Sequence, residues 1–202
     1  MRTITKNLYS FSELSDDAKQ NAIQNYRNGM IFAWQDEIIN TICAIAKAIY
    51  CDYDYYSYDG ITYTVSFTPN DWDDNLDLTG VRAWAYIENN FITPFEKPKT
   101  YWFNHCLYTD GRKNWSRKSK INKNIRNCVF TGYCADDCYY FAWEDWKKHF
   151  TKNSTVKDFI DAVADALSKE WSNDNEYQYS DEGIIELIEA NDFEFYEDGG
   201  IY

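Results

Sequence analysis

The last residues of the chain, Tyr177–Tyr202, have the sequence YQYSDEGIIELIEANDFEFYEDGGIY. Ser180 is a favourable helix N-cap, and the carboxylates of Asp181 and Glu182 follow in the first turn, where they meet the positive end of the helix dipole. The apolar residues after them fall on one helix face: Ile184, Leu187 and Ile188. The stretch therefore predicts an amphipathic helix that begins after Ser180.

A short strand and a chain reversal are predicted to follow this helix. Asn191 is a common type of helix end, and Phe193 and Phe195 alternate with Glu194 as in a half-buried strand. Asp198-Gly199-Gly200 supplies residues that tolerate positive φ, as a tight turn requires. We therefore expect the acidic side chains of this end to lie outside a helix and a strand that apolar residues anchor.

The charge of the chain is large and unevenly distributed. From Glu170 to Tyr202 there are 11 acidic side chains and no lysine or arginine. In contrast, the segment Arg112–Arg126, here called the basic island, has seven basic residues and no acid. The chain carries a formal charge of −13, so the rest of it amounts to −20. Because such a field repels phosphate, we expect no direct binding to duplex DNA or to anionic membranes.

Length and composition predict one folded domain, 1–202. An aromatic content of 19% and a hydrophobic content of 45% exclude a disordered chain. No apolar run approaches the ~20 residues that span a bilayer, and the first residues lack the apolar core of a signal peptide. We expect a soluble, unsecreted, cytoplasmic protein whose six cysteines are thiols or metal ligands and not disulfides.

Two helices are predicted over residues 12–50. Ser12 or Ser15 caps the first, which ends at Gly29 and has its apolar residues at four-residue spacing: Leu14, Ala18, Ala22 and Tyr26. The second keeps one apolar stripe: Ile31, Trp34, Ile38, Ile42, Ile45 and Ile49. Because the connection is short, we expect the pair to pack as a hairpin or at a sharp corner.

The segment 51–78 is acidic and rich in tyrosine. Apolar and polar residues alternate from Ile61 to Phe67, which predicts a strand with one solvent-exposed face. The strand is expected to end at Pro69. An acidic loop over 70–77 is predicted next. Further helices are predicted at 79–91 before Pro94, from Asp136 or Asp137 onward, and after a cap at Ser154 or Thr155 within the C-terminal segment 136–202.

The expected fold class is α+β, a helix-rich single domain with a small, mostly antiparallel sheet. The strands of that sheet are expected near 61–67, 101–106 and 192–196. The basic island is expected to form a polar helix or an exposed loop.

A group of cysteine and histidine residues offers one alternative function, a zinc protein or a Cys/His enzyme: His105, Cys106, Cys128, Cys134 and Cys138. Its Cys-x5-Cys-x3-Cys spacing lacks the close Cys-x2-Cys pair of structural zinc modules, and buried thiols explain the count. There is no Gly-x-Ser-x-Gly, phosphate-binding glycine loop or His-Glu-x-x-His motif. We therefore expect no catalytic residue, no metal and no cofactor.

Exposed carboxylates form the predicted binding site: Asp71, Asp73, Asp74, Asp77, Asp181, Glu182, Glu186, Glu189, Glu194, Glu197 and Asp198. The four aspartates of 71–77 lack the glycine and terminal glutamate of a calcium loop. Carboxylates on rigid elements can instead imitate the phosphate row of a nucleic acid and occupy a basic groove. The alternative is that they only keep the protein soluble.

A secondary basic patch is predicted within the basic island, at Arg117, Lys118, Lys120 and Lys123. We expect this patch to contact the protein's own acidic surface or an acidic partner, because the net field of the chain disfavours phosphate.

Three segments carry a resemblance: Leu8–Lys19 (LYSFSELSDDAK) with Ala22-Ile23 and Tyr26-Arg27, Tyr179–Glu186 (YSDEGIIE) with Glu189–Phe195 (EANDFEF), and Cys128–Cys134. With them the chain resembles a family of small acidic proteins of unassigned role that phages and prophage-like elements carry. The resemblance implies that the gene is carried on mobile elements together with accessory genes that act against host defence. It implies no catalytic residue. Gly183 departs from the larger residue expected in this family's C-terminal helix and is expected to loosen its first turn.

The favoured function is that of a phage-encoded, non-enzymatic inhibitor of a host nucleic-acid-handling defence complex, of the anti-CRISPR type. Such a protein would act in the cytoplasm of the bacterial host cell. It would place its acidic surface in the basic groove of a host protein, for example a CRISPR effector. A second alternative is a regulatory or antitoxin-like protein that uses the basic island to bind nucleic acid or an acidic partner.

Overall fold

Two compact units make up the structure. The computed structural model describes residues 6–69, 75–93, 101–107, 113–118, 130–131 and 133–202, with the backbone alone at 101–107 and 113–118. The terminal unit comprises Met1–Trp34, Tyr58–Thr62 and Ser172–Tyr202, and the central unit comprises Gln35–Ser57 and Tyr63–Trp171. The expected single domain stays a prediction, because two units of one chain can unfold together or separately.

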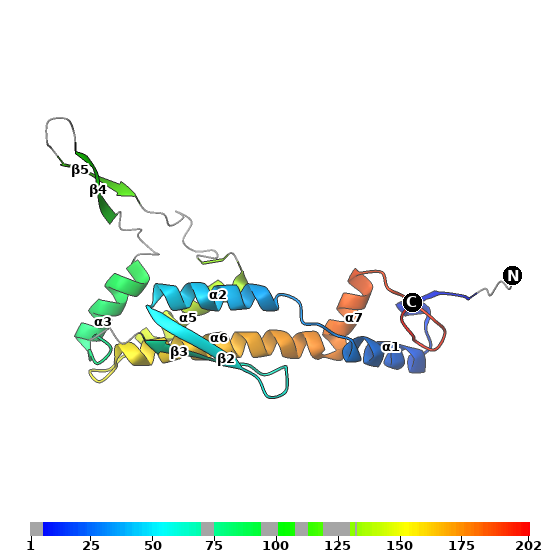
Figure 1. The fold of residues 1–202 in the computed structure, drawn as a ribbon. Helices are drawn as coiled ribbons and strands as arrows, with labels where there is room; N and C mark the ends of the chain where they lie inside the picture. The colour runs from blue at the N-terminus through cyan, green and yellow to red at the C-terminus, as the bar shows by residue number, and fades with distance from the viewer. Residues whose placement is uncertain (1–5, 70–74, 94–100, 108–112, 119–129, 132) are drawn as a thin grey trace. The chain divides into compact units, whose positions relative to one another are not determined.

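Helices dominate both units (Figure 1). They are α1 (Asp16–Asn28), α2 (Gln35–Ala48), α3 (Val81–Ile87), α5 (Asp137–Lys148), α6 (Val156–Tyr179) and α7 (Asp181–Ala190), with 3-10 turns η1 (Phe11–Glu13) and η3 (Cys134–Asp136) and a π-helical turn η2 (Glu88–Ile92). The described strands form three antiparallel pairs: β1 (Tyr9–Ser10) with β6 (Glu194–Phe195), β2 (Cys51–Tyr56) with β3 (Thr64–Pro69), and β4 (Tyr101–Leu107) with β5 (Lys113–Lys118). The helix-rich α+β class is confirmed.

The strands differ from the sequence prediction in their partners. The three strands expected to share one sheet lie in three separate pairs. The strand predicted from Ile61 begins at Thr64, where the expected alternation of exposed and buried side chains also begins. It pairs with β2, a strand that the sequence did not predict, from Cys51 opposite Pro69 to Tyr56 opposite Thr64.

The described part of the basic island, Lys113–Lys118, forms a strand and not the predicted polar helix or exposed loop. Lys113–Lys118 forms β5 of the β4–β5 hairpin, so the backbone at Arg117 and Lys118 is extended. Lys120 and Lys123 lie outside the described residues.

The helical pair predicted over 12–50 is present as α1 and α2, but the two helices belong to different units. The second helix begins at Gln35, later than predicted. Ile31 and Trp34 precede it with 88% and 59% of their surface exposed, and the apolar stripe is buried from Ile38 onward. Trp34 has a φ of 66°, which a helix does not allow, and this explains the late start.

Aromatic rings fill the core of the central unit. The indole of Trp143 lies 5.3 Å from that of Trp84 and 5.6 Å from that of Trp146, and all three pack beside Phe150 or Phe159. Rings that meet edge to face or offset contribute more than their buried area alone. The high aromatic content of the sequence is thus used in packing.

A buried carboxylate joins the start of α5 to α2. Asp136 is fully buried and accepts hydrogen bonds from the backbone N–H groups of Phe130 and Thr131, both at 2.9 Å. The hydroxyls of Thr131 and Thr41 donate to it at 3.1 and 3.3 Å. Because a buried carboxyl group is tolerated when hydrogen bonds satisfy it, this network holds Phe130 and Thr131 beside Asp136 and Thr41 of α2. Thr131, one of the described residues of the Cys128–Cys134 segment, therefore has a packing role.

Replacement of Asp136 by Ala is expected to lower the free energy of unfolding by about 2–4 kcal/mol, because two backbone donors lose their acceptor in the core. Urea denaturation followed by circular dichroism measures the change. Asp165→Ala, at an exposed site on α6, is the control and should stay within about 0.5 kcal/mol of the parent. An equally small effect of both changes would contradict the role given to the network.

The terminal unit joins the two ends of the chain. Tyr9 pairs with Phe195 and Ser10 with Glu194 across the β1–β6 ladder, and α1 packs against α7 (Figure 1). One apolar cluster lies beneath these elements: Phe11, Leu14, Ala18, Ala22, Ile23, Ile184, Ile188 and Phe195. The N-terminal and C-terminal segments of the resemblance thus form one packed structure.

Arg27 of α1 fastens the junction between α6 and α7. Its Nε donates to the carbonyl of Tyr179 at 3.2 Å, its guanidinium lies 5.2 Å from the ring centre of Tyr179, and it forms an ion pair with Asp181. The predicted cap at Ser180 is confirmed, since its hydroxyl accepts the Gly183 N–H at 3.1 Å. The predicted helix ends at Gly29 and Asn191 are confirmed as well.

The structure gives a steric reason for glycine at position 183 that the sequence did not show. A Cβ at this position would lie 2.2 Å from the carbonyl oxygen of Tyr177, far inside contact distance. The glycine therefore allows the first turn of α7 to approach the end of α6.

Gly183→Ala is expected to destabilise the terminal unit. A helix-interior alanine gains ~1 kcal/mol over glycine in propensity, but the clash with backbone should outweigh this, for a net loss of about 1–2 kcal/mol. Thermal and urea unfolding measure the sign. Gly29→Ala is the matched control, since its new Cβ would meet only atoms at 3.9 Å. A stabilised Gly183→Ala variant would show that the helices separate without cost.

Candidate functional site

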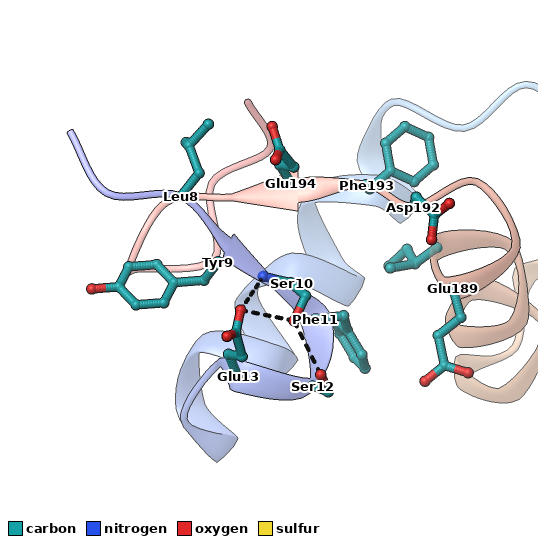
Figure 2. Close-up of a pocket in the computed structure, with 11 residues that line it drawn as sticks. Leu8, Tyr9, Ser10, Phe11, Ser12, Glu13, Glu189, Asp192, Phe193 and Glu194 are labelled. Atoms are coloured by element: carbon teal, nitrogen blue, oxygen red, sulfur yellow. Dashed lines mark hydrogen bonds between the residues drawn. The ribbon is translucent and has the colours of Figure 1, made fainter.

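A groove in the terminal unit is the candidate site (Figure 2). Its volume is about 550 Å3. One side comes from β1 and η1 and the other from the end of α7 and β6, and the lining residues are Leu8, Tyr9, Ser10, Phe11, Ser12, Glu13, Ile188, Glu189, Asp192, Phe193 and Glu194. The groove therefore lies where the two ends of the chain meet.

The C-terminal wall is built by the way α7 ends. The N–H of Phe193 donates to the carbonyl of Ile188, and the N–H of Asp192 donates to that of Glu189, both at 3.3 Å. Asp192 has a φ of 51°, in the left-handed region. These are the bonds of a Schellman motif, which satisfies the last carbonyls of a helix and turns the chain away from its axis. The turn brings Phe193 and Ile188 to the same groove.

The N-terminal wall is held by a capping box. Figure 2 shows the Glu13 carboxylate turned back onto Ser10, whose N–H and hydroxyl donate to it at 2.8 and 2.9 Å. The backbone hydrogen bond from Ser10, followed by its hydroxyl, lowers the pKa of Glu13 below the ordinary 4.5. The cap of the next helix, α1, is Ser15, whose hydroxyl accepts the Ala18 N–H at 3.3 Å, so Ser15 and not Ser12 caps this helix.

The lining of the groove includes both apolar and acidic side chains. Phe11 and Ile188 are buried in the terminal core, and Phe193 packs on the same cluster. The acidic side chains are exposed: Glu13, Glu189, Asp192 and Glu194. No lysine or arginine is among the lining residues. A surface of this kind can hold a cation that also has an apolar stem.

The predicted binding residues are only partly gathered here. Glu189 and Glu194 line the groove. Asp181 pairs with Arg27, and Glu186 accepts the hydroxyl of Tyr177 at 2.6 Å, which raises the pKa of that tyrosine. The remaining acids of the C-terminal set are exposed elsewhere in the terminal unit: Glu182, Glu197 and Asp198. Asp77 belongs to the central unit, and Asp71, Asp73 and Asp74 lie outside the described residues.

Sequence reasoning missed the N-terminal half of the groove. The Ser10-x-x-Glu13 spacing is the signature of a capping box and could have predicted their contact. Asp192 was counted among the acids but not among the binding residues, because the backbone geometry at the end of α7 was not visible in the pattern.

The cysteine and histidine group does not come together in the part of the chain that the structure describes. No three His, Cys, Asp or Glu side chains among the described residues are placed to hold a metal ion. Cys134 is exposed, and burial raises the pKa of the Cys138 thiol to about 12. Cys128 and the side chains of His105 and Cys106 lie outside the described residues. His149 is exposed, and its Nδ1 lies 3.4 Å from Oδ2 of Asp145.

None of the helices in the described ranges is long and apolar enough to cross a bilayer. Comparison of the chain with protein-family models, curated proteins and solved structures finds no match. The functional argument therefore rests on the residues of this chain.

Charge separates the two units. The terminal unit has 14 acidic and four basic residues, a formal charge of −10 out of −13 for the whole chain. The central unit, which includes the basic island, amounts to −3. The acidity of this protein is thus mainly a property of the unit that contains the groove.

The capping box predicts a pH dependence of stability. Because the pKa of Glu13 is lowered on folding, its carboxylate stabilises the folded state above pH 4.5, and this contribution is lost as the pH falls through the lower folded value. The free energy of unfolding should therefore fall less steeply for the Glu13→Gln variant than for the parent as the pH is lowered from 6 to about 3. Glu197→Gln, also exposed in the terminal unit, is the control. If the free energy of unfolding depended on pH equally in both variants, the Glu13 carboxylate would not have the stabilising role given to it here.

Proposed function

We propose that this chain is a non-enzymatic inhibitor that places the acidic surface of its terminal unit in the basic, nucleic-acid-binding groove of a host protein. The observation that carries the proposal is the concentration of a formal charge of −10 in that unit. In keeping with the family resemblance, we place the protein among phage-borne factors directed against bacterial defence, of the anti-CRISPR type, acting in the host cytoplasm.

The acidic side chains are presented on anchored elements. Ile184 and Ile188 bury one face of α7, and Phe195 buries one face of β6, while the acids on the opposite faces are exposed. Carboxylates fixed on ordered backbone lose less conformational entropy on binding than carboxylates on a mobile tail. This favours a role as a rigid counterpart of the phosphate row over a role in solubility alone.

Few cations of the terminal unit compete for these carboxylates. Arg27 is largely buried against Tyr179 and Asp181, and the Lys6 ammonium lies 4.2 Å from the ring centre of Tyr196. The unit therefore presents an excess of negative charge to a partner. Attraction of this kind raises the association rate and weakens as salt is added.

Charge reversal in the terminal unit tests the proposal. The variant Glu176→Lys, Glu182→Lys and Glu197→Lys changes the charge by six at exposed sites outside the groove. Its matched control, Glu37→Lys, Glu88→Lys and Asp165→Lys, makes the same change at exposed sites of the central unit. Circular dichroism checks that both variants fold.

The immobilised full chain is exposed to nuclease-treated bacterial lysate, and captured proteins are eluted with salt or with a 20-base-pair DNA duplex. We expect DNA to displace the partner, salt to weaken its binding steeply, and the terminal variant to bind at least about tenfold more weakly than the control variant. Binding that resists both DNA and salt, or equal loss in the two variants, would leave the acids with a role in solubility only.

A further inference from the structure

We propose that the β4–β5 hairpin of the central unit binds single-stranded nucleic acid, with bases stacked on Trp102 and Trp115 and phosphates held by Lys113 and Arg117. This inference goes beyond the proposed function, because it uses the other unit and charge of the opposite sign. The site lies apart from the groove of the terminal unit.

The backbone register of the hairpin defines the face that carries the site. β4 and β5 run antiparallel (Figure 1), with Trp102 opposite Arg117 and Asn104 opposite Trp115. Residues paired across an antiparallel ladder share a face of the sheet, and so do residues two apart in one strand. Trp102 and Asn104 of β4 therefore share one face with Trp115 and Arg117 of β5.

Lys113 extends the same face along β5. The shift of register lies on β4, between Asn104 and Cys106, and β5 pairs at every residue from Lys113 to Lys118. Lys113, Trp115 and Arg117 are two apart from one another and fall on one side of that strand. We call the set Trp102, Asn104, Lys113, Trp115 and Arg117 the tryptophan face.

The hairpin has a composition that favours an anionic ligand. The seven residues of β4 and the six of β5 include four aromatic residues, three basic residues and no acid. The other hairpin of the central unit differs, because its strand β2 alternates tyrosines with Asp52 and Asp54. Basic and aromatic residues thus coincide in one of the two hairpins.

The aromatic residues distinguish nucleic acid from an acidic protein. Basic residues alone fit either ligand, and the sequence analysis favoured an acidic protein surface for this part of the chain. Nucleic acid repeats a phosphate and a flat base, and proteins that bind single strands combine a basic track with aromatic rings on which successive bases stack. Lys113, Trp115 and Arg117 alternate these two chemistries along one strand.

A single strand fits this face better than a duplex. In a duplex the bases are stacked on one another, so tryptophans gain no base and only phosphates remain for the basic residues. The net charge of −13 opposes phosphate binding, although charges farther away than about 8 Å are largely screened at physiological ionic strength. Stacking does not depend on that charge, so it favours the single strand selectively.

Titration of the full chain with oligonucleotides tests the assignment. The probes are fluorescein-labelled 12-nucleotide oligothymidine and oligouridine and a 12-base-pair DNA duplex, and fluorescence anisotropy reports binding. We expect at least one single strand to bind about tenfold or more tightly than the duplex, and the tighter of the two identifies DNA or RNA as the ligand. Single strands that bind no more tightly than the duplex would overturn the proposal.

An acidic peptide tests the other class of ligand. A 12-residue glutamate peptide should not displace the bound oligonucleotide at an equal concentration, because it offers no rings for stacking. Displacement at that concentration would assign the tryptophan face to an acidic protein instead.

Removal of the indoles tests the stacking. The variant Trp102→Leu and Trp115→Leu keeps apolar residues in both strands and should bind the single strand at least about tenfold more weakly, with an unchanged salt dependence. The control Tyr56→Leu and Tyr58→Leu removes two exposed rings elsewhere and should stay within about twofold. Circular dichroism checks that each variant folds, and an equal loss in the two variants would contradict the site.

Removal of the charges gives a second, independent readout. Each phosphate contact of a single strand contributes about 0.7 to the slope of log affinity against log salt, so Lys113→Gln with Arg117→Gln should reduce that slope by about 1.4. The control Lys148→Gln with Lys152→Gln removes the same charge at exposed positions of the central unit and should leave the slope unchanged. Equal slopes in the two variants would leave only a diffuse field and overturn the local site.

The two proposals fail in different ways. If the oligonucleotides do not bind but charge reversal in the terminal unit abolishes partner capture, the hairpin assignment is wrong and the acidic-surface function stands. If the tryptophan face binds a single strand but charge reversal leaves capture unchanged, the nucleic-acid site stands without the proposed inhibitor function.

Discussion

The contact on which the terminal unit depends is the pairing of β1 with β6, together with the packing of α1 on α7. It joins residues nearly 190 positions apart in the sequence, Tyr9 and Phe195, and closes one apolar cluster beneath them. Without this closure α7 would have no surface against which to bury Ile184 and Ile188. A ten-residue helix rarely persists alone in water, so the display of acids on α7 follows from the long-range contact.

Like charges oppose that closure, and the sequence compensates in two places. Burial of each large aliphatic or aromatic side chain stabilises the folded unit by about 1.5–3 kcal/mol, whereas exposed charges repel one another weakly through water and salt. Arg27 adds a cation at the junction where the first carboxylate of α7, Asp181, meets the end of α6. Burial of the apolar cluster therefore stabilises the terminal unit by more than the repulsion between its exposed carboxylates destabilises it.

Periodicity predicted most of the helices because each has a capping side chain or an apolar stripe that local sequence records. The hydroxyls of Ser15, Ser180 and Thr155 each accept the backbone N–H three residues ahead, and such caps are visible as patterns. Strand partners were not predictable, because β1 and β6 are two residues each and their pairing is set by the cluster beneath them. For the same reason the acids were found by counting, while the groove that gathers Glu13, Asp192 and Glu194 required the fold.

Asp192 is where the demands of the fold and of the candidate site diverge. The position after the end of α7 requires a left-handed backbone, for which glycine is the residue of least cost, and the chain has glycine at Gly199 where a similar φ of 84° and a close approach to Ala18 occur. At Asp192 a carboxylate is kept instead. Departures from local preference tend to occur where a side chain has another task, and this one faces the groove between two further carboxylates in the chain, Glu189 and Glu194. The same turn that ends the helix thus places an acidic side chain in the lining of the groove.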